Sequence, residues 1–257
     1  MAREDCKQLA PADLSEVVRK IRARTPARLL EGRAGAAYRT STQLDLREAH
    51  AAARDAVRAE LDLEIAFGAE FVKQWGLFVV NTQAREKEAY LLRPDLGRRF
   101  DEESRAMIQR GCPRGNDFQI AIADGLSVSA VARQVPALLP LLMQGAKARG
   151  WSCGQLFAIR HCRVGILNEI GELLDPRVAV LLIGERPGLA TAESLSAYMA
   201  YRPRAGHTDA ERNLISNIHA RGVSHESATA RILNLAAKMI ETKLSGITLR
   251  EELHALE

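Results

Sequence analysis

Short apolar runs alternate with helical stretches through most of this 257-residue chain, and this alternation is the feature that most constrains its fold. The runs with the length and composition of buried strands are Leu77–Val80, Ala89–Leu92, Phe118–Ala123, Leu156–Ile159 and Val178–Ile183. Strands joined by helices pair in parallel, because the helix returns the chain to the edge at which the previous strand began. The sequence therefore predicts an α/β fold, with helices on both faces of a mostly parallel sheet.

The residues before the first strand have a helical pattern. An amphipathic helix is expected over Leu14–Arg24, where Asp13 has the position and chemistry of an N-cap. A long Ala-rich helix is expected to run from a cap at Thr40–Thr42 to about Leu61.

A further amphipathic helix is expected after the last strand, with Ser224 as its cap and Gly246 at its end. Its inward face should consist of apolar residues at helical spacing, namely Ala228, Ile232, Leu235, Ala236, Met239 and Ile240. No low-complexity linker divides the chain. We therefore expect a helical N-terminal segment over residues 1–75 and an α/β domain with a Rossmann-like sheet over residues 76–257.

Composition excludes disorder and a membrane span. With 47% apolar and 26% charged residues, the chain can bury a core. Its longest stretch without a charged residue, Gln134–Ala146, is shorter than the roughly 20 apolar residues that a spanning helix needs. The first residues are charged and have no apolar centre, so no secretory signal is expected and the protein is predicted to be cytoplasmic.

Nucleic acid is not an expected partner, although the net charge is +4 and arginine supplies most of the basic residues. Binding to a nucleic acid would require basic residues gathered on one face, or aromatic side chains alternating with them. No expected helix gathers its arginines in this way, and aromatic residues make up only 5% of the chain.

Generic motifs identify no chemistry. Cys6, Cys112, Cys153 and Cys162 form no C-x-x-C pair and lie at no metal-binding spacing from a histidine, so free thiols are expected. The chain also lacks H-E-x-x-H, a Walker A loop, G-x-G-x-x-G and G-x-S-x-G. Neither a metal site nor an activated nucleophile is predicted.

Two polar, glycine-containing segments follow expected strands. Asp124-Gly125-Leu126-Ser127 comes after one, and Gly184-Glu185-Arg186-Pro187-Gly188 comes after another. Ligands of open α/β sheets bind at the carboxyl ends of the strands, so these loops are candidates for a ligand crevice. In the structural alternative, Asp124 only caps a helix and the glycines only form turns.

A series of segments is more specific than any single motif. In chain order these are Gly32-Arg33-Ala34-Gly35, Leu91-Leu92-Arg93-Pro94-Asp95-Leu96-Gly97-Arg98-Arg99, Ile122-Ala123-Asp124-Gly125-Leu126-Ser127, Glu169-Ile170-Gly171-Glu172-Leu173-Leu174, Leu182-Ile183-Gly184-Glu185-Arg186-Pro187-Gly188-Leu189, Glu193-Ser194-Leu195-Ser196, Arg212-Asn213-Leu214-Ile215-Ser216-Asn217-Ile218 and Leu244-Ser245-Gly246-Ile247. The series resembles the small (light) subunit of ethanolamine ammonia-lyase from about Thr25 to Leu249.

The resemblance implies an adenosylcobalamin-dependent enzyme that converts ethanolamine to acetaldehyde and ammonia. In that family a large barrel subunit binds the amino alcohol and hosts the radical chemistry, while the small subunit helps to enclose the cobalamin. This chain is therefore expected to bind cofactor and to assemble with the large subunit, without a catalytic residue or metal ligand of its own. Within the cytoplasm, the inside of a bacterial microcompartment is a second location to consider.

The resemblance carries three cofactor-contacting positions onto this chain, Val164, Glu185 and Leu214. The corrin rim carries neutral amides, and Glu185 suits the role of acceptor for one of them. Val164 suits an apolar or backbone contact. Leu214 departs from the family pattern, because many relatives have cysteine there, so only a backbone or dispersion contact is expected. In the structural alternative, Val164 and Leu214 belong to the core.

Asn217-Ile218-His219-Ala220-Arg221-Gly222 has the spacing of the D-x-H-x-x-G motif, in which a histidine binds the cobalt of cobalamin. Asn217 stands where that motif has an aspartate, and a neutral amide cannot polarise the imidazole as a carboxylate does. His219 is therefore expected to be a surface or interface residue and not a cobalt ligand.

Three alternatives remain open at this stage. The chain could be a corrinoid carrier or chaperone without a lyase partner. It could also be a generic α/β enzyme that acts on a small phosphorylated ligand through Asp124 and the 184–188 loop. The amphipathic helix at 14–24 could address a microcompartment shell, although packing against its own domain is the preferred expectation.

Overall fold

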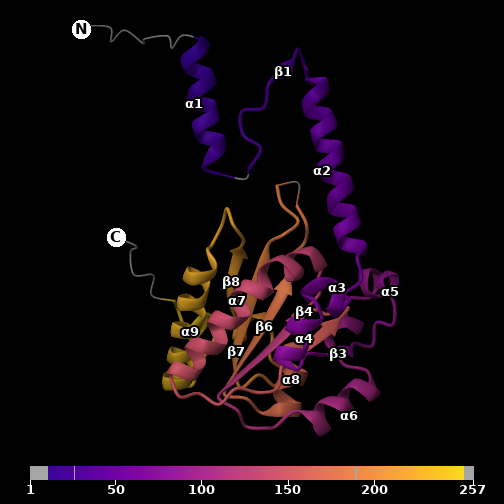
Figure 1. The fold of residues 1–257 in the computed structure, drawn as a ribbon, viewed down its shortest axis with the longest axis vertical. Coiled ribbons are helices and arrows are strands. Elements are labelled where there is room, and N and C mark those ends of the chain that lie inside the picture. The colour runs from indigo at the N-terminus through magenta and orange to yellow at the C-terminus, as the bar shows by residue number, and fades with distance from the viewer. Residues whose placement is uncertain (1–10, 26, 189, 252–257) are drawn as a thin grey trace, which may run out of the picture.

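The computed structural model describes residues 11–25, 27–188 and 190–251, which form a helix-covered sheet and a projecting helical arm (Figure 1). The strand order of the main sheet is β3-β5-β4-β6-β7-β8. The strands span Phe78–Asn81 (β3), Phe118–Ala123 (β4), Phe157–Arg160 (β5), Val178–Gly184 (β6), Leu195–Tyr201 (β7) and Asn213–Ile218 (β8).

The first four strands of the sheet are parallel and the last two are antiparallel. β3 pairs with β5, β5 with β4, and β4 with β6 in parallel, whereas β6–β7 and β7–β8 are antiparallel. The prediction of a mostly parallel α/β sheet is confirmed. β7 and β8 were not predicted; loops and a short 3-10 helix, η2 (Asp209–Glu211), connect them instead of crossover helices, and this allows antiparallel pairing.

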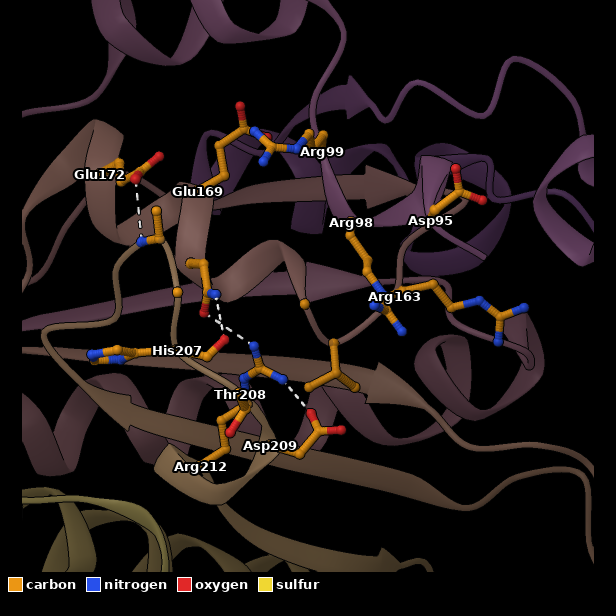
Figure 2. Close-up of a pocket in the computed structure, with 15 residues that line it drawn as sticks. Asp95, Arg98, Arg99, Arg163, Glu169, Glu172, His207, Thr208, Asp209 and Arg212 are labelled. Carbon is orange, nitrogen blue, oxygen red and sulfur yellow. Dashed lines mark hydrogen bonds and ion pairs between the residues drawn. The ribbon is translucent and has the colours of Figure 1, made fainter. Parts of the chain in front are cut away.

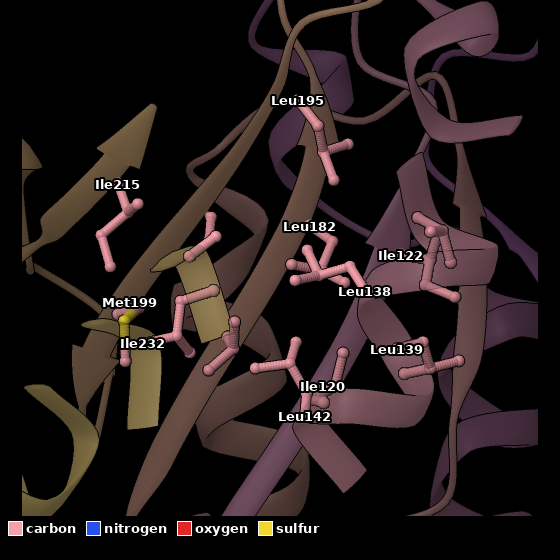
Figure 3. Packing of buried hydrophobic residues seen from close by; sticks show 14 of the residues in the cluster. Ile120, Ile122, Leu138, Leu139, Leu142, Leu182, Leu195, Met199, Ile215 and Ile232 are labelled. Atoms are coloured by element: carbon pink, nitrogen blue, oxygen red, sulfur yellow. The ribbon is translucent and has the colours of Figure 1, made fainter. Parts of the chain in front are cut away.

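Two helices cover one face of the sheet. α7 (Val128–Ala148) and α9 (His225–Thr242) pack on the face that carries Ile120, Leu182 and Ile215, as Figure 3 shows. The other face is covered by α6 (Glu102–Gly111) and α8 (Ile166–Leu174).

Burial on both faces explains why the central strands are apolar throughout. Along β4, Ile120 and Ile122 contribute to the core under α7, whereas Ala121 and Ala123 contribute to the core under α8. Successive side chains of a strand point to opposite faces, so a doubly covered strand requires apolar residues at every position.

The edge strand β8 is covered more fully on one face than on the other. Met199 and Ile215 are fully buried under α7 and α9, but Leu214, which is adjacent to Ile215 and faces the opposite way, is 45% exposed. This uncovered part of the sheet borders the carboxyl ends of the parallel strands and forms part of the site described below.

The N-terminal region forms an arm that extends beyond the sheet (Figure 1). It consists of α1 (Pro11–Ala23), the two-stranded hairpin β1 (Arg33–Ala34) and β2 (Ala37–Tyr38), and α2 (Thr40–Arg58). Two short helices, α3 (Leu63–Phe67) and α4 (Ala69–Trp75), connect it to β3, and Leu63 is part of the main core. The proposed division at residues 75 and 76 stays a prediction.

The apolar stripe of α1 does not pack against the sheet domain. Val17 is 43% exposed and Ile21 is 38% exposed, so the expectation that this helix covers its own domain is wrong. The helix begins at Pro11, and Asp13 therefore lies inside its first turn instead of capping it. The N-cap of α2 is Arg39, without a side-chain bond, so the cap expected at Thr40–Thr42 is also wrong.

The run Ala89–Leu92 is helical and not a strand. It belongs to α5 (Lys87–Leu92), in which the buried residues Lys87 and Tyr90 are three positions apart and Leu92 is 77% exposed. Burial at this spacing requires a helical turn, and a four-residue apolar run does not distinguish it from a strand. A 3-10 helix, η1 (Leu96–Arg98), follows α5.

The C-terminal helix α9 agrees with its predicted cap and apolar face. The Ser224 side chain accepts a hydrogen bond from the N–H of Ser227. The helix ends at Thr242, where Lys243 adopts the left-handed conformation, so Gly246 begins the 3-10 helix η3 (Gly246–Thr248) and does not end α9. None of the helices within the described ranges is long and apolar enough to cross a membrane.

Candidate functional site

A pocket of about 370 Å³ lies where the parallel strands end, and it contains all three predicted cofactor positions. Val164 comes from the loop after β5, Glu185 from the loop after β6, and Leu214 from the uncovered face of β8. Tyr90, Ser196 and Tyr198 also line the pocket. The pocket therefore combines apolar surface with polar and charged groups at the carboxyl ends of the strands, where ligands of α/β sheets bind.

The two glycine-containing loops lie directly against each other at this edge. The N–H of Leu126 donates to the carbonyl of Gly184 at 3.1 Å. Gly125 has a φ of +56°, and a Cβ added there would lie 2.3 Å from the same carbonyl oxygen, closer than any side chain permits. The two loops are therefore in backbone contact, and this close approach explains the glycine at position 125.

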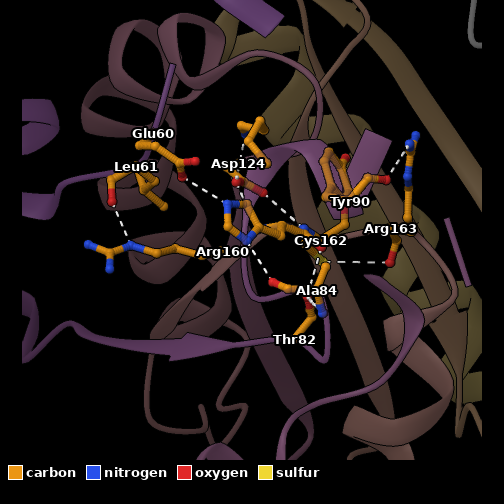
Figure 4. A network of polar contacts seen from close by, with 11 residues as sticks. Glu60, Leu61, Thr82, Ala84, Tyr90, Asp124, Arg160, Cys162 and Arg163 are labelled. Atoms are coloured by element: carbon orange, nitrogen blue, oxygen red, sulfur yellow. Dashed lines mark hydrogen bonds and ion pairs between the residues drawn. The ribbon is translucent and has the colours of Figure 1, made fainter. Parts of the chain in front are cut away.

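Asp124 fixes the loop that carries Val164, but it does not reach the pocket. Its carboxylate is fully buried and accepts from the backbone N–H groups of His161 at 2.8 Å and Cys162 at 3.0 Å (Figure 4). Lys87 Nζ lies 3.3 Å from the same carboxylate. Asp124 is therefore not a ligand contact. It is not a helix cap either, because Ser127 caps α7.

The ring of His161 extends this buried network. Its Nδ1 lies 2.7 Å from the carbonyl oxygen of Ala84, and its Nε2 lies 2.8 Å from a carboxylate oxygen of Glu60. The Tyr90 ring stacks on it, and the Tyr90 hydroxyl donates to the carbonyl of Cys162 at 3.0 Å. These contacts hold the backbone between β5 and α8 in one conformation.

One oxygen of Glu185 is bonded within the protein, while the other is free within the described residues. Oε1 accepts from Ser196 Oγ at 2.7 Å and from the N–H of Asn217 at 2.8 Å. Glu185 forms no ion pair with any arginine in the described ranges, so a surface salt bridge does not account for it. The free oxygen can accept a hydrogen bond from a ligand.

The reactive groups that line the pocket are held in their neutral forms. Burial, and then the charge of Asp124, raise the pKa of the Cys162 thiol well above its usual value. Burial also raises the pKa of Tyr198. A thiol that stays protonated is a poor nucleophile, so these side chains suit binding and not covalent chemistry.

His219 is buried and not at the surface, which corrects the sequence prediction. Only 5% of it is exposed. Its Nδ1 accepts from the N–H of Arg221 at 3.2 Å, and its Nε2 lies 2.7 Å from the Asn217 side-chain oxygen. Both ring nitrogens are therefore engaged within the protein. Burial, and then the charge of Arg221, lower the pKa of His219.

A second pocket of about 560 Å³ adjoins the first, and its arginines were not identified as functional from the sequence. It shares Arg163 and Val164 with the first pocket and is also lined by Arg98 and Arg212 (Figure 2). Arg98 and Arg212 belong to segments that carry the family resemblance, but nothing in the sequence shows that these segments converge.

The fold and the pockets define a Rossmann-like α/β domain with a candidate ligand site. Its site lies at the carboxyl ends of parallel strands and combines free hydrogen-bonding groups with exposed apolar surface. The described part of the chain contains no group of three or more His, Cys, Asp or Glu side chains that could hold a metal ion.

Comparison with known proteins identifies the family. The family model for the ethanolamine ammonia-lyase light chain (EutC) matches residues 15–250. The chain belongs to this family, as its sequence predicted.

Curated relatives agree over nearly the whole chain, and each is named ethanolamine ammonia-lyase small subunit. The relative from Clostridium perfringens is 42% identical over 240 residues, which are 93% of this chain and 79% of the relative. The relative from Fusobacterium nucleatum is 40% identical over 253 residues, covering 97% and 84%. The relative from Listeria monocytogenes is 41% identical over 240 residues, covering 93% and 80%.

Proposed function

We propose that this chain is the small subunit of an adenosylcobalamin-dependent ethanolamine ammonia-lyase and forms one wall of the cobalamin site. The observation that carries the proposal is the convergence of Val164, Glu185 and Leu214, which are far apart in the sequence, in one pocket. The family supports the reaction, the conversion of ethanolamine to acetaldehyde and ammonia.

The chemistry of the pocket fits the rim of a corrin. Glu185 Oε2 has no partner within the described residues and can accept from a corrin amide. The N–H of Val164 donates to no group in the described ranges and is available to an amide carbonyl. Leu214 presents apolar surface that is 45% exposed, which suits contact with the apolar part of the macrocycle.

Cobalamin, when bound, supplies the radical that starts the reaction. The residues of this chain bind and orient the cofactor and exclude water from one side of it. We propose that Cys162 and Tyr198 do not act as bases in the reaction, because burial raises the pKa of both groups and keeps them protonated.

We propose that the large, barrel-type subunit covers the pocket and supplies the substrate site. The relatives are named small subunits, which supports such a partner. The arm supports such a partner too. Its helix α2 lines a further pocket together with the 186–188 loop, which adjoins the pocket that contains Glu185. Large apolar side chains of the arm are exposed, namely Val17, Ile21, Leu29, Leu30, Tyr38 and Leu44.

Location inside a bacterial microcompartment is a further part of the proposal. The exposed stripe of α1, with Val17 and Ile21, supports it, because an amphipathic helix without a partner in its own domain can bind another protein. Deleting residues 1–24 should leave the two-subunit complex intact but abolish its cosedimentation with coexpressed shell proteins.

The proposal is tested by expressing the chain with and without its large subunit and titrating each preparation with cobalamin. The two-subunit complex should bind cobalamin and release acetaldehyde from ethanolamine, whereas the chain alone should not turn over. A chain that binds corrinoid but never copurifies with the large subunit would support the carrier alternative. Turnover by the chain alone would refute the division of labour.

A further inference from the structure

Two arginines at the junction of the two pockets have no acidic partner within the described residues. They are Arg98 and Arg163. The acids that line the same pocket are all engaged: Asp95 with Arg93 at 2.7 Å, Glu169 with Arg105 at 2.5 Å, Glu172 with the N–H of Ala205 at 3.2 Å, and Asp209 with Arg212. Arg99, which also lines the pocket, has no acidic partner either, whereas Glu172 has no basic one within the described residues. The unpaired charge of the pocket is therefore positive, and Arg98 and Arg163 carry the part of it that lies at the junction.

Arg163 is held in position by its own packing. Its guanidinium lies over the Tyr90 ring, 4.3 Å from the centroid, and its Nη2 lies 3.4 Å from the Tyr90 carbonyl oxygen. Its Nε is buried and has no hydrogen-bond partner within the described chain. A buried donor without a partner costs stability, and a bound acceptor would remove that cost.

Arg98 is placed beside the same loop by two glycines. The N–H of Arg163 donates to the carbonyl of Gly97 at 2.8 Å, which ties η1 to the loop after β5. A Cβ added to Gly165 would lie 2.9 Å from Arg98 Cγ, so the stem of this arginine packs against the glycine backbone. Figure 2 shows Arg98 and Arg163 close together at one side of the pocket.

The N-terminus of α8 adds donors at the same place. Its N-cap is Gly165, which offers no side-chain cap, and the N–H groups of Val164 and Gly165 have no acceptor within the described residues. A helix N-terminus favours negative charge through its free N–H groups and its dipole.

Arg212, on the opposite side of the pocket, independently indicates that the pocket binds a hydrogen-bond acceptor. Its side chain is only 6% exposed, and it is bonded to Asp209 and, at 3.0 Å, to the side-chain oxygen of Asn168. Its Nε remains without a partner in the described part of the chain, although it is buried. A second buried guanidinium nitrogen is thus left for an acceptor that the described protein residues do not supply.

We propose that Arg98, Arg163 and the N-terminus of α8 form an oxyanion site that takes a phosphate ester. Arginine and helix N-termini are the usual donors for phosphate oxygens. Arg163 and Val164 line both pockets, so the oxyanion site is continuous with the proposed corrin site. On the basis of the proposed function, this site binds the phosphodiester in the nucleotide tail of cobalamin.

The test compares three corrinoids on the assembled two-subunit complex. Cobalamin has the phosphodiester, cobinamide lacks both the phosphate and the nucleotide base, and cobinamide phosphate retains the phosphate alone. Affinities are measured by equilibrium dialysis with absorbance detection, independently of turnover. The variants are Arg98→Gln, whose side chain is exposed, Arg163→Gln, and the control Arg110→Gln, an exposed arginine outside both pockets.

Arg98→Gln and Arg163→Gln should each weaken cobalamin and cobinamide phosphate about ten- to hundred-fold, because a charge-assisted hydrogen bond is lost. Cobinamide affinity should stay within about two-fold, and Arg110→Gln should change none of the three. Equal weakening of cobalamin and cobinamide by both pocket variants would overturn the site. No weakening by either variant would overturn it as well.

If the proposed function is wrong, the binding measurements give a different result. If the wild-type complex binds none of the corrinoids, inorganic phosphate is titrated by calorimetry. Binding of phosphate that is lost in Arg98→Gln but not in Arg110→Gln would support the oxyanion site with a free phosphate as its ligand. The absence of phosphate binding would overturn the site together with the proposed function.

Discussion

The N–H of Asn217 donates a hydrogen bond to Glu185 Oε1 at 2.8 Å and so ties the loop after β6 to the far end of β8. Ser196 donates to the same oxygen from β7. Glu185 therefore fastens three segments of the antiparallel edge with one oxygen and presents the other to the pocket. Its removal should affect both stability and ligand binding, and the two effects can be separated.

Glu185→Gln should weaken cobalamin binding with little loss of stability. Glutamine keeps one oxygen for Ser196 and Asn217, but replaces the free oxygen with an NH₂ donor, which cannot accept from a corrin amide. We expect about a five- to hundred-fold loss of cobalamin affinity in the two-subunit complex. The Michaelis constant for ethanolamine should not change. Titration with cobalamin and the melting temperature of the complex provide the two readouts.

Glu185→Ala is the matched comparison. It removes both oxygens, so it should add a stability loss of about 1–3 kcal/mol to the same loss of affinity. Wild-type affinity in both variants would remove Glu185 from the cofactor site and leave it a purely structural residue.

Leu214→Ala should reduce cobalamin affinity more than it reduces stability. The side chain is 45% exposed, so truncation should cost less than about 1.5 kcal/mol of folding free energy. Loss of its apolar contact with the cofactor should weaken binding about three- to ten-fold. Leu92→Ala, at a site 77% exposed and outside the pocket, is the control. Unchanged affinity in Leu214→Ala would mean that this face does not contact cobalamin.

Asp124→Asn should be strongly destabilising, by about 3–5 kcal/mol, because it leaves the buried Lys87 ammonium without its counter-charge. Lys87→Met should be destabilising for the converse reason. The double variant should lose less than the sum of the two single variants, as urea unfolding can measure. Additive losses would show that the two charges do not stabilise each other.

The sequence predicted the parallel part of the fold because local patterns determine it. Phe118–Ala123 and Val178–Gly184 are buried on both faces and are therefore apolar at every position. β8 escaped prediction because only one of its faces is well covered and polar residues interrupt its apolar pattern. β7 is buried along most of its length, but Ser196 interrupts its apolar run. The strand expected at 89–92 became a helix because Tyr90 and Lys87 are buried one turn apart.

The site could be predicted only as far as the family resemblance reached. The resemblance identified Val164, Glu185 and Leu214, but not the hydrogen bond between Glu185 and Asn217, which joins residues 32 positions apart. Arg98 and Arg163 were missed for the same reason. Their convergence depends on the packing of η1 against the loop after β5, and contacts between distant loops leave no periodic signal in a sequence.

Cobalamin bound to the complex should keep its own nucleotide base on cobalt. Both nitrogens of His219 are engaged, by Asn217 and by the N–H of Arg221, so neither is free to coordinate a metal. Electron paramagnetic resonance of the cob(II)alamin complex, prepared with ¹⁵N-labelled protein, should show superhyperfine splitting from an unlabelled nitrogen. Splitting from a labelled protein nitrogen would contradict the prediction.

Protonation of His219 should destabilise the folded chain. The N–H of Arg221 donates to Nδ1, so the neutral ring carries its proton on Nε2 and donates to the Asn217 oxygen. Burial of the charged ring, and then the charge of Arg221, lower the pKa of His219. Protonation of Nδ1 would also break its hydrogen bond with the N–H of Arg221.

The sign of the resulting pH dependence follows from linkage. Below the ordinary histidine pKa of 6.5 the unfolded chain takes up a proton at this position before the folded chain does, so the unfolding free energy falls as the pH decreases through the lowered pKa. Above 6.5 the contribution of His219 is constant. Urea unfolding between about pH 8 and pH 5 should therefore show a decline that is weaker in His219→Gln and unchanged in His50→Gln, an exposed control on α2. The decline should persist in part, because burial also lowers the pKa of His207. An unaltered profile in His219→Gln would show that this imidazole titrates alike in the folded and unfolded chain.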